Sequence, residues 1–380
     1  MTATDSARRF PPNPWLTLSL AFATFMTAWP QPRDGTLAFL VLSATTLASV
    51  RFRLGPIALV VLFAVGVELR YAQFGVGYSD VAETIRATIN DLAAGLNPYL
   101  QFADRPPFPY GPLALLWYMP FNDPGTQEFV ISILILGVLA VRGQPMGLAL
   151  FATMPLFVLL ASDGSNDHSA ALFLLVALLV LERMPRAGAV LIGLSAGFKI
   201  YSLAWLPPVF FWVGVGTSGA IAFALGIVGF LIAWLPAAFL WGAGNILSAI
   251  QAADAVHRAP FFSLGETLSR VFRINIARES LNLFRLLAGL GTALIVSPFV
   301  RTYRGVVMAG MVIYFVTLYA GYWSTPAYLV APFLVICWFI DAWLGPVATR
   351  VAWPSDPVGR FTGWVDQRWP AVDATRIANP

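Results

Sequence analysis

Apolar residues along this chain fall into long blocks separated by short polar, arginine-bearing or proline-rich segments. Most blocks approach the ~20 residues that a helix needs to cross a bilayer, whereas a transmembrane barrel would show alternating strands of about ten residues. The pattern therefore predicts an all-α polytopic membrane protein with about twelve spans. We place these spans at residues 15–29, 36–50, 56–72, 127–141, 146–161, 168–182, 187–201, 202–215, 218–240, 281–299, 305–320 and 326–344.

Two segments between the third and fourth spans follow other patterns. Residues 81–96 carry Ile85, Ile89 and further apolar residues on one helical face, with polar residues elsewhere. This predicts an amphipathic helix that lies in the membrane interface and ends at Gly95. Residues 110–121 are apolar but too short to span, so they predict a re-entrant or membrane-lying piece. We therefore expect interfacial helices in an extracytoplasmic loop.

The composition supports a membrane protein. Of the 380 residues, 58% are hydrophobic and 11% are charged, against about 25% charged residues in an ordinary soluble domain. The net charge of +4 does not indicate nucleic-acid binding, because the arginines lie between apolar blocks, as in loops that set membrane topology. The single cysteine, Cys337, lies inside an apolar run, which excludes a disulfide framework and favours a packing role.

The placement of arginines predicts the orientation. With the N-terminus inside, short loops such as those of Arg51 and Arg142 fall on the cytoplasmic side, as the positive-inside rule requires. The second outer loop also carries arginines, but long segments translocate largely regardless of charge. We expect a single transmembrane domain over residues 1–380, in the cell (inner or plasma) membrane, with both termini cytoplasmic. Its outer loops and its cytoplasmic tail are predicted at residues 73–126, 241–280 and 345–380.

Asp80 stands just after the third predicted span and before the amphipathic segment. With Glu83 three residues later it fits a capping box, which is a structural role. A carboxylate at the start of an interfacial helix is also fixed in place and open to water, as a catalytic base must be. Spacing alone leaves both interpretations open.

Lys199 is the only lysine of the sequence and stands at the outer end of a predicted span. It either snorkels toward the interface or acts as a point charge on a phosphate. His257 and Arg258, in the second outer loop, could supplement it, because arginine binds phosphate oxygens through two donors.

Other polar and aromatic side chains share the outer face in this topology. The turn from Asp163 to His168 is either a solvated loop in which Asp167 caps the next helix, or a set of substrate contacts. It does not predict a metal site. Aromatic rings near this face fit an interfacial belt or stack on sugars. The candidate contacts to a sugar or an acceptor are Tyr99, Tyr110, Asp163, Asn166, Asp167, His168, Tyr322 and Trp323.

The order of these pieces resembles the GT-C membrane glycosyltransferases, and within them the family 87 or DUF2029-type α-mannosyltransferases. The likeness covers roughly residues 56–345 and consists of short, degenerate motifs. One departure is an extra pair of spans ahead of the Asp80 loop, which in the family pattern usually follows the first span. The motifs are Gly77-Tyr78-Ser79-Asp80, Gly95-Leu96-Asn97-Pro98-Tyr99, Tyr110-Gly111-Pro112-Leu113, Asn166-Asp167-His168 and Gly193-Leu194 through Gly197-Phe198-Lys199.

The resemblance implies a GT-C-like bundle and an inverting transfer of a sugar, mannose foremost, from a polyprenyl-phosphate-linked donor. The acceptor would be a glycolipid or glycan at the extracytoplasmic face. Asp80 would be the general base, and Lys199, Arg258 and His257 would stabilise the departing phosphate. The partners are thus the lipid-linked donor, the acceptor and membrane lipids, with no nucleic acid. No cofactor is implied, and the need for a divalent metal ion stays open.

Other functions stay open at this point. A ligase- or polymerase-like enzyme with a lipid-diphosphate donor would rely on outer-loop arginines, which residues 241–280 supply. A lipid or solute transporter would tend to show inverted repeats and polar groups near the midplane, whereas the polar groups predicted here gather at one surface. Glucose, galactose or arabinose could replace mannose in the donor.

Overall fold

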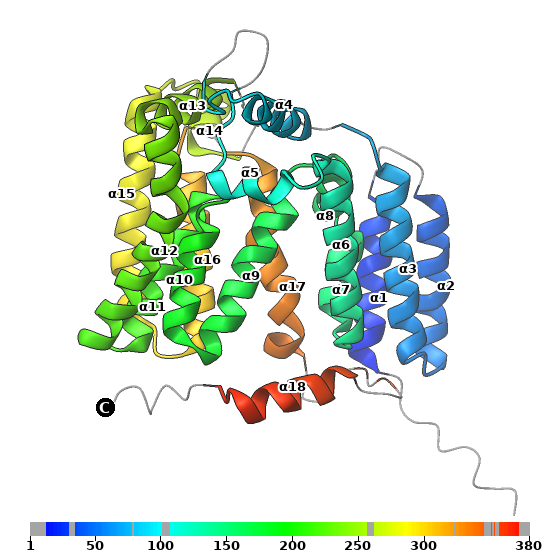
Figure 1. Ribbon diagram of the computed structural model, residues 1–380. Coiled ribbons are helices and arrows are strands. Elements are labelled where there is room, and N and C mark those ends of the chain that lie inside the picture. The colour runs from blue at the N-terminus through cyan, green and yellow to red at the C-terminus, as the bar shows by residue number, and fades with distance from the viewer. Residues whose placement is uncertain are drawn as a thin grey trace, which may run out of the picture. The chain divides into compact units, whose positions relative to one another are not determined.

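The protein is helical in a computed structural model, whose helices are labelled in Figure 1. The model describes residues 13–29, 35–77, 80–100, 107–256, 262–322, 324–345, 351, 353 and 357–371, and none of these residues forms a strand. The chain divides into two compact units. Unit 1 comprises residues 1–78, 129–163 and 333–363, and unit 2 comprises residues 79–128, 164–332 and 364–380.

Among the described residues, five helical segments are long and apolar enough to cross a membrane. They are α3 (Pro56–Gln73), α6 (Pro124–Val141), α12 (Thr217–Trp241), α15 (Arg278–Val296) with η2 (Ser297–Phe299), and η3 (Pro326–Leu329) with α17 (Val330–Leu344). Shorter apolar helices accompany them: α1 (Pro14–Thr27), α2 (Thr36–Arg51), η1 (Ile200–Trp205) continued by α11 (Leu206–Val213), and α16 (Tyr303–Tyr319). Among the described residues, the prediction of an all-α chain with helices long and apolar enough to cross a membrane is confirmed.

In unit 1 one predicted span is wrong. The span predicted at 146–161 is two helices, α7 (Pro145–Thr153) and α8 (Pro155–Ser162). They separate at Met154, which is extended because the residue before a proline avoids the helical region.

Arg70 of α3, also in unit 1, is fully buried. Its guanidinium donates to the carbonyls of Phe151 at 2.6 Å and Ala152 at 3.1 Å, so it is a structural bridge between α3 and the α7–α8 pair.

In unit 2 the long helices run alternately in opposite directions (Figure 1), and elements that carry several of the predicted site residues begin or end at one end. At this end, α9 (Asp167–Arg183) begins, α10 (Pro185–Ser195) leads into Lys199, and α12 ends at Trp241. We call it the site end. The opposite end of α9 carries Arg183, which pairs with Asp366 of α18 (Pro357–Arg368) at 2.6 Å.

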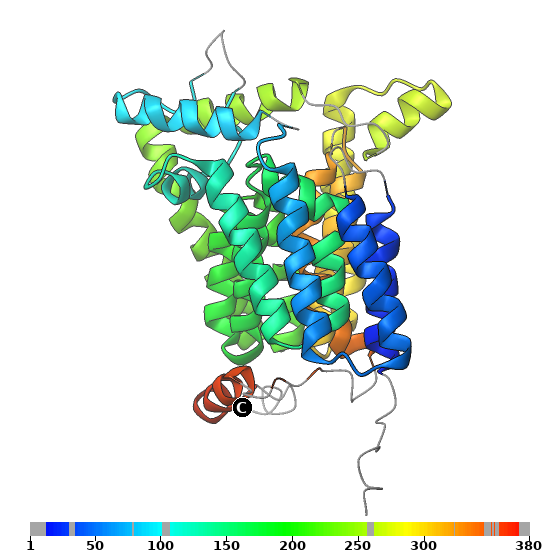
Figure 2. The same ribbon diagram turned by 90° about the vertical axis from the view of Figure 1, so that its right-hand side faces the viewer.

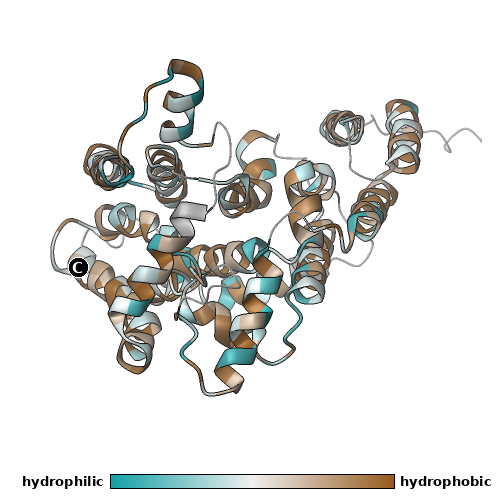
Figure 3. Ribbon diagram, turned by 90° about the horizontal axis from the view of Figure 1, so that it is seen from above, coloured by the Kyte–Doolittle hydropathy of each residue, from teal (hydrophilic) through white to brown (hydrophobic). Residues whose placement is uncertain are grey.

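Short helices lie across the site end (Figures 1 and 2). They are α4 (Val81–Ala93), α5 (Pro112–Tyr118), α13 (Ala243–Val256) and α14 (Leu264–Phe272). Figure 3, which looks from above, shows hydrophilic and hydrophobic positions mixed along the helices nearest the viewer. On α4 the predicted apolar face is confirmed, since Ile85 and Ile89 are buried and the helix stops just before Gly95.

The polar face of α4 makes one ion pair. Arg86 lies 2.7 Å from Asp123, which precedes α6. Hydrogen bonding from Thr126, together with the guanidinium of Arg86, holds the pKa of Asp123 below its usual range, although partial burial opposes this. Both partners are substantially exposed, so the pair fastens α4 only weakly.

Small residues set the distance between α10 and α12. A Cβ atom added at Gly193 would overlap the carbonyl of Gly226, and one at Gly229 would overlap the carbonyl of Val190. Such small-residue contacts let helix backbones approach closely in the absence of a hydrophobic driving force between helices. The loop that carries Lys199 therefore starts from a tightly packed helix pair.

Candidate functional site

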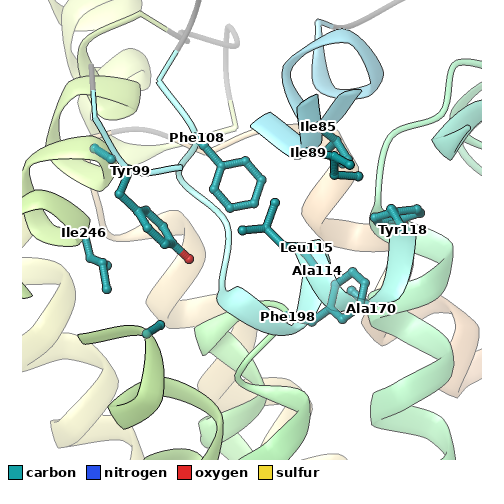
Figure 4. Close-up of a cluster of buried hydrophobic side chains, with 12 residues drawn as sticks. Ile85, Ile89, Tyr99, Phe108, Ala114, Leu115, Tyr118, Ala170, Phe198 and Ile246 are labelled. Atoms are coloured by element: carbon teal, nitrogen blue, oxygen red, sulfur yellow. The ribbon is translucent and has the colours of Figure 1, made fainter. Parts of the chain in front are cut away.

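A buried apolar cluster fastens α4 and α5 to the rest of the site end (Figure 4). Ile85 and Ile89 of α4 belong to it, as do Leu115 and Tyr118 of α5. It also includes Phe198, the residue just before Lys199, which is 1% exposed. The helix that begins at Asp80 and the loop that carries Lys199 are thus parts of one packed structure, although they lie far apart in the sequence.

Two of the motifs named above meet directly. The N–H of Gly111 donates to the carbonyl of Phe198 at 3.4 Å, and that of Leu113 donates to the carbonyl of Gly197 at 3.1 Å. A Cβ atom at Gly111 would overlap the carbonyl oxygen of Gly197. The 110–113 motif therefore needs glycine at its second position, because its backbone lies against the backbone that leads to Lys199.

Tyr99 joins the same group from the 95–99 motif. Its hydroxyl donates to the carbonyl of Tyr110 at 3.1 Å, and the amide of Asn97 donates to the carbonyl of Trp241 at 2.8 Å. Burial raises the pKa of Tyr99 above its usual range, so this hydroxyl keeps its proton and remains a donor. The 95–99 motif is thus joined through Tyr110 to the 110–113 motif, which in turn contacts the loop before Lys199.

Lys199 forms an ion pair with Asp167, the first residue of α9. The Asp167 side chain is 4% exposed, and the lysine side chain is 11% exposed. The ammonium also lies 4.8 Å from the centre of the Tyr328 ring, which is within cation–π range. The snorkelling interpretation of Lys199 is therefore wrong, because its charge is directed at a buried carboxylate.

Aromatic rings surround this ion pair on one side. The ring of Tyr201 lies 5.2 Å from that of Tyr328 and 5.8 Å from that of Tyr314. The hydroxyl of Tyr314 donates to the carbonyl of Tyr328 at 2.6 Å. Lys199 thus lies beside Tyr328, which packs against Tyr201 and accepts a hydrogen bond from Tyr314. None of these three tyrosines was among the predicted site residues.

Glu128 is a second buried carboxylate that sequence reasoning missed. It is fully buried and accepts hydrogen bonds from the Tyr118 hydroxyl at 2.5 Å, the His168 N–H at 2.9 Å and the Ser169 N–H at 3.2 Å. The Ser169 hydroxyl also donates to it. Burial raises the pKa of Tyr118, so this hydroxyl stays protonated. One signal was available, since Glu128 is the only charged residue in the predicted span 127–141.

Glu128 takes over the capping role that the sequence assigned to Asp167. The first N–H groups of any α-helix lack partners within the helix. In α9 these donors bond to Glu128, which belongs to α6. The prediction that Asp167 caps α9 is therefore wrong, and its carboxylate pairs with Lys199 instead.

Asp80 lies at the N-terminal boundary of α4 and is half-buried. Its backbone carbonyl accepts from the N–H of Thr84 at 2.9 Å. Within the described first turn of α4, however, its side chain accepts no capping hydrogen bond, so the capping-box prediction is wrong. Asp80 is not a member of the Lys199–Asp167 pair, and its role as a base stays a prediction.

The remaining candidates are distributed unevenly. Asn166 is fully buried, and neither atom of its amide has a hydrogen-bond partner among the described residues. The Nδ1 atom of His168 lies 3.8 Å from Glu128. Asp163 is the last residue of its stretch of unit 1, and Tyr322 accepts from the Ser263 hydroxyl at 2.9 Å through its carbonyl. Outside the described residues lie His257, Arg258 and Trp323.

The chemistry of this site is a charge pair in a largely apolar, tyrosine-lined setting. Lys199 can hold an anionic group, and the buried side-chain amide of Asn166 can donate a hydrogen bond to a ligand or accept one from it. Within the described ranges, no group of three or more His, Cys, Asp or Glu side chains is placed to hold a metal ion. Comparison with protein-family models, curated proteins and solved structures finds no match.

Proposed function

We propose that this protein is an inverting membrane glycosyltransferase that uses a polyprenyl-phosphate-linked sugar, with mannose foremost, as its donor. The acceptor is a glycolipid or glycan. The observation that carries the proposal is the packing of three motifs around the segment that ends at Lys199, the only lysine of the chain. The 110–113 motif contacts the backbone of that segment, the 95–99 motif contacts Tyr110, and Asp167 of the 166–168 motif pairs with Lys199 itself. A single cation beside a buried carboxylate supports a site that takes up an anionic headgroup.

The proposed orientation follows from the arginines. With the loops of Arg183 and Arg186 and of Arg301 and Arg304, which belong to unit 2, in the cytoplasm, the site end of unit 2 would face the extracytoplasmic side under the positive-inside rule. The transverse helices α4 and α14 would then lie in the membrane interface. The four shorter apolar helices, together with α9, α10 and the α7–α8 pair, would bring the number of spans to about twelve. A lipid-linked sugar would reach Lys199 without leaving the membrane.

In the proposed reaction, Asp80 removes the proton of an acceptor hydroxyl as that oxygen attacks the anomeric carbon. The new bond forms between the acceptor oxygen and the anomeric carbon, and the bond from this carbon to the phosphate oxygen breaks. The electron pair goes to the phosphate, which leaves as polyprenyl phosphate. One displacement inverts the configuration, so a β-linked donor yields an α-linked product.

Lys199 acts on the leaving group. Negative charge grows on the phosphate as the bond breaks, and a preorganised cation stabilises that charge most where water is largely excluded. In the described state this cation is compensated by Asp167. The incoming phosphate would therefore share or replace Asp167 as the partner of Lys199.

The test is a transfer assay in membranes that contain endogenous acceptors, with radiolabelled mannosyl, glucosyl, galactosyl and arabinosyl polyprenyl phosphates. We expect one monophosphate donor to be used by the wild type and transfer to fall about 10²–10⁴-fold in Asp80→Asn. Glu83→Gln, on the exposed face of the same helix, is the matched control and should retain transfer. Equal rates in wild type and Asp80→Asn would remove Asp80 from the mechanism. Activity with diphosphate donors alone would favour the ligase-like alternative.

A further inference from the structure

An open apolar groove lies at the site end of unit 2, between α14, α15 and α16. It has a volume of about 470 Å³, within the roughly 300–1,000 Å³ of small-ligand sites. Its walls include Leu264 from α14, Phe284 and Ala288 from α15, Phe315 and Tyr319 from α16, and Ala320, which follows α16. The walls are hydrocarbon and aromatic surface, which suits an apolar chain.

Arg285 stands at one edge of this groove. It follows the groove residue Phe284 on α15. Its guanidinium lies against Gly321, which follows the groove residue Ala320, and a Cβ atom added at Gly321 would overlap the guanidinium. The same guanidinium donates to the hydroxyl of Tyr201 at 3.3 Å. Tyr201 lies two residues after Lys199. A second cation therefore connects the groove to the Lys199 site.

We infer that this groove binds the hydrocarbon chain of an isoprenoid phosphate, with Arg285 at its edge contacting the phosphate. This inference deepens the proposed function, on which it rests for the choice of an isoprenoid chain. Arginine suits the role because its planar guanidinium can donate two parallel hydrogen bonds to phosphate oxygens. Charge complementarity thus selects an anionic amphiphile over a neutral one.

The groove and the arginine contribute differently. A hydrocarbon chain that moves from the bilayer into an apolar groove gains no hydrophobic stabilisation, because lipid tails are as apolar as leucine. The groove therefore sets the position of the chain, and the cations that contact the phosphate, Arg285 together with Lys199, supply the affinity. Removing the charged donor should weaken binding by about 10- to 100-fold, whereas filling the groove should displace the chain without altering the phosphate contact.

The experiment uses the full-length protein in nanodiscs and a sugar-free isoprenoid phosphate with a diazirine near the end of its chain. After illumination, labelled peptides are mapped by mass spectrometry. We expect labelling within residues 284–288 and 315–320, and an apparent affinity about 10- to 100-fold lower in Arg285→Gln. Arg285→Lys keeps the charge and should recover part of the loss. Tyr201→Phe keeps the ring and should lower affinity only slightly.

Ala288→Phe tests the groove itself, because the added ring occupies its volume, and should abolish labelling of both segments. Leu287→Phe adds a ring to an exposed neighbour on the same helix, outside the groove lining, and should leave labelling unchanged. The inference fails if Ala288→Phe labels like the wild type. It also fails if a polyprenol without phosphate, or a diacyl phosphatidic acid, competes as well as the isoprenoid phosphate.

The probe separates this inference from the proposed function because it carries no sugar. Labelling that depends on Arg285 and Ala288, without sugar transfer from any donor, would uphold the groove and overturn the glycosyltransferase. Sugar transfer with a donor affinity that is unchanged in Arg285→Gln and Ala288→Phe would uphold the glycosyltransferase and overturn the groove as the binding site of the chain.

Discussion

The structural role of Lys199 can be separated from its catalytic role with three variants of its ion pair: Lys199→Met, Asp167→Asn and the double variant. The Asp167 side chain is 4% exposed, so Lys199→Met leaves a buried charge without its partner, which costs about 3–5 kcal/mol of folding free energy. Asp167→Asn should cost less, about 1–3 kcal/mol, because the lysine is more exposed and keeps the Tyr328 ring 4.8 Å away. The double variant carries no unpaired charge and should recover to within about 1–2 kcal/mol of the wild type.

The assay is unfolding of the purified protein in mixed micelles, followed by tryptophan fluorescence as the fraction of denaturing detergent rises. A control comes from the pair of Arg86 and Asp123, both of which are substantially exposed, where Arg86→Met should cost at most about 1 kcal/mol. Sugar transfer is measured on the same preparations. If Lys199 stabilises the departing phosphate, the double variant is stable but inactive. Wild-type stability in Lys199→Met, or transfer restored together with stability in the double variant, would refute this reasoning.

Three further outcomes follow from the described contacts. Glu128→Gln keeps the size of the side chain but turns an amide toward the first N–H groups of α9, so unfolding should become about 2–4 kcal/mol easier, with faster amide exchange at the start of α9. Gly111→Ala places a methyl group on the carbonyl of Gly197 and should lower the yield of folded protein, whereas Gly291→Ala meets no atom within 4 Å and should be neutral or slightly stabilising. The folded-state pKa of Asp123 is lowered, so its contribution is present above pH ~4 and is lost as the pH falls through the lowered pKa. Exposure limits that contribution to about 1 kcal/mol, and Asp123→Asn should remove this part of the pH dependence of the unfolding midpoint.

Helical structure was predictable from the chain because each apolar block forms its helix through local bonds alone. The predicted span 168–182, for example, is α9 at Asp167–Arg183, and 218–240 is α12 at Thr217–Trp241. The error at 146–161 was avoidable, since Pro155 lacks the N–H that a continuous helix would need at that position.

The candidate site was less predictable because its contacts join distant segments. Spacing suggested that Asp80 and Asp167 cap the helices beside them, since capping boxes are local patterns. Glu128 caps α9 from another helix, 40 residues before His168, and no local pattern marks such a partner. Lys199 was recognisable by its rarity, but its pairing with Asp167 and its tyrosine neighbours depend on packing that a single sequence does not encode locally.

The most direct test of the central claim is the fate of both halves of the donor, measured with purified protein in liposomes that contain a glycolipid extract as acceptor. The donor is β-mannosyl phosphoryl polyprenol labelled in the sugar and, separately, in the lipid. We predict equimolar release of polyprenyl monophosphate and α-linked mannosyl product by the wild type, with neither formed by Asp80→Asn. Release of lipid phosphate without a glycosylated product, or no reaction with any lipid monophosphate sugar, would contradict the account.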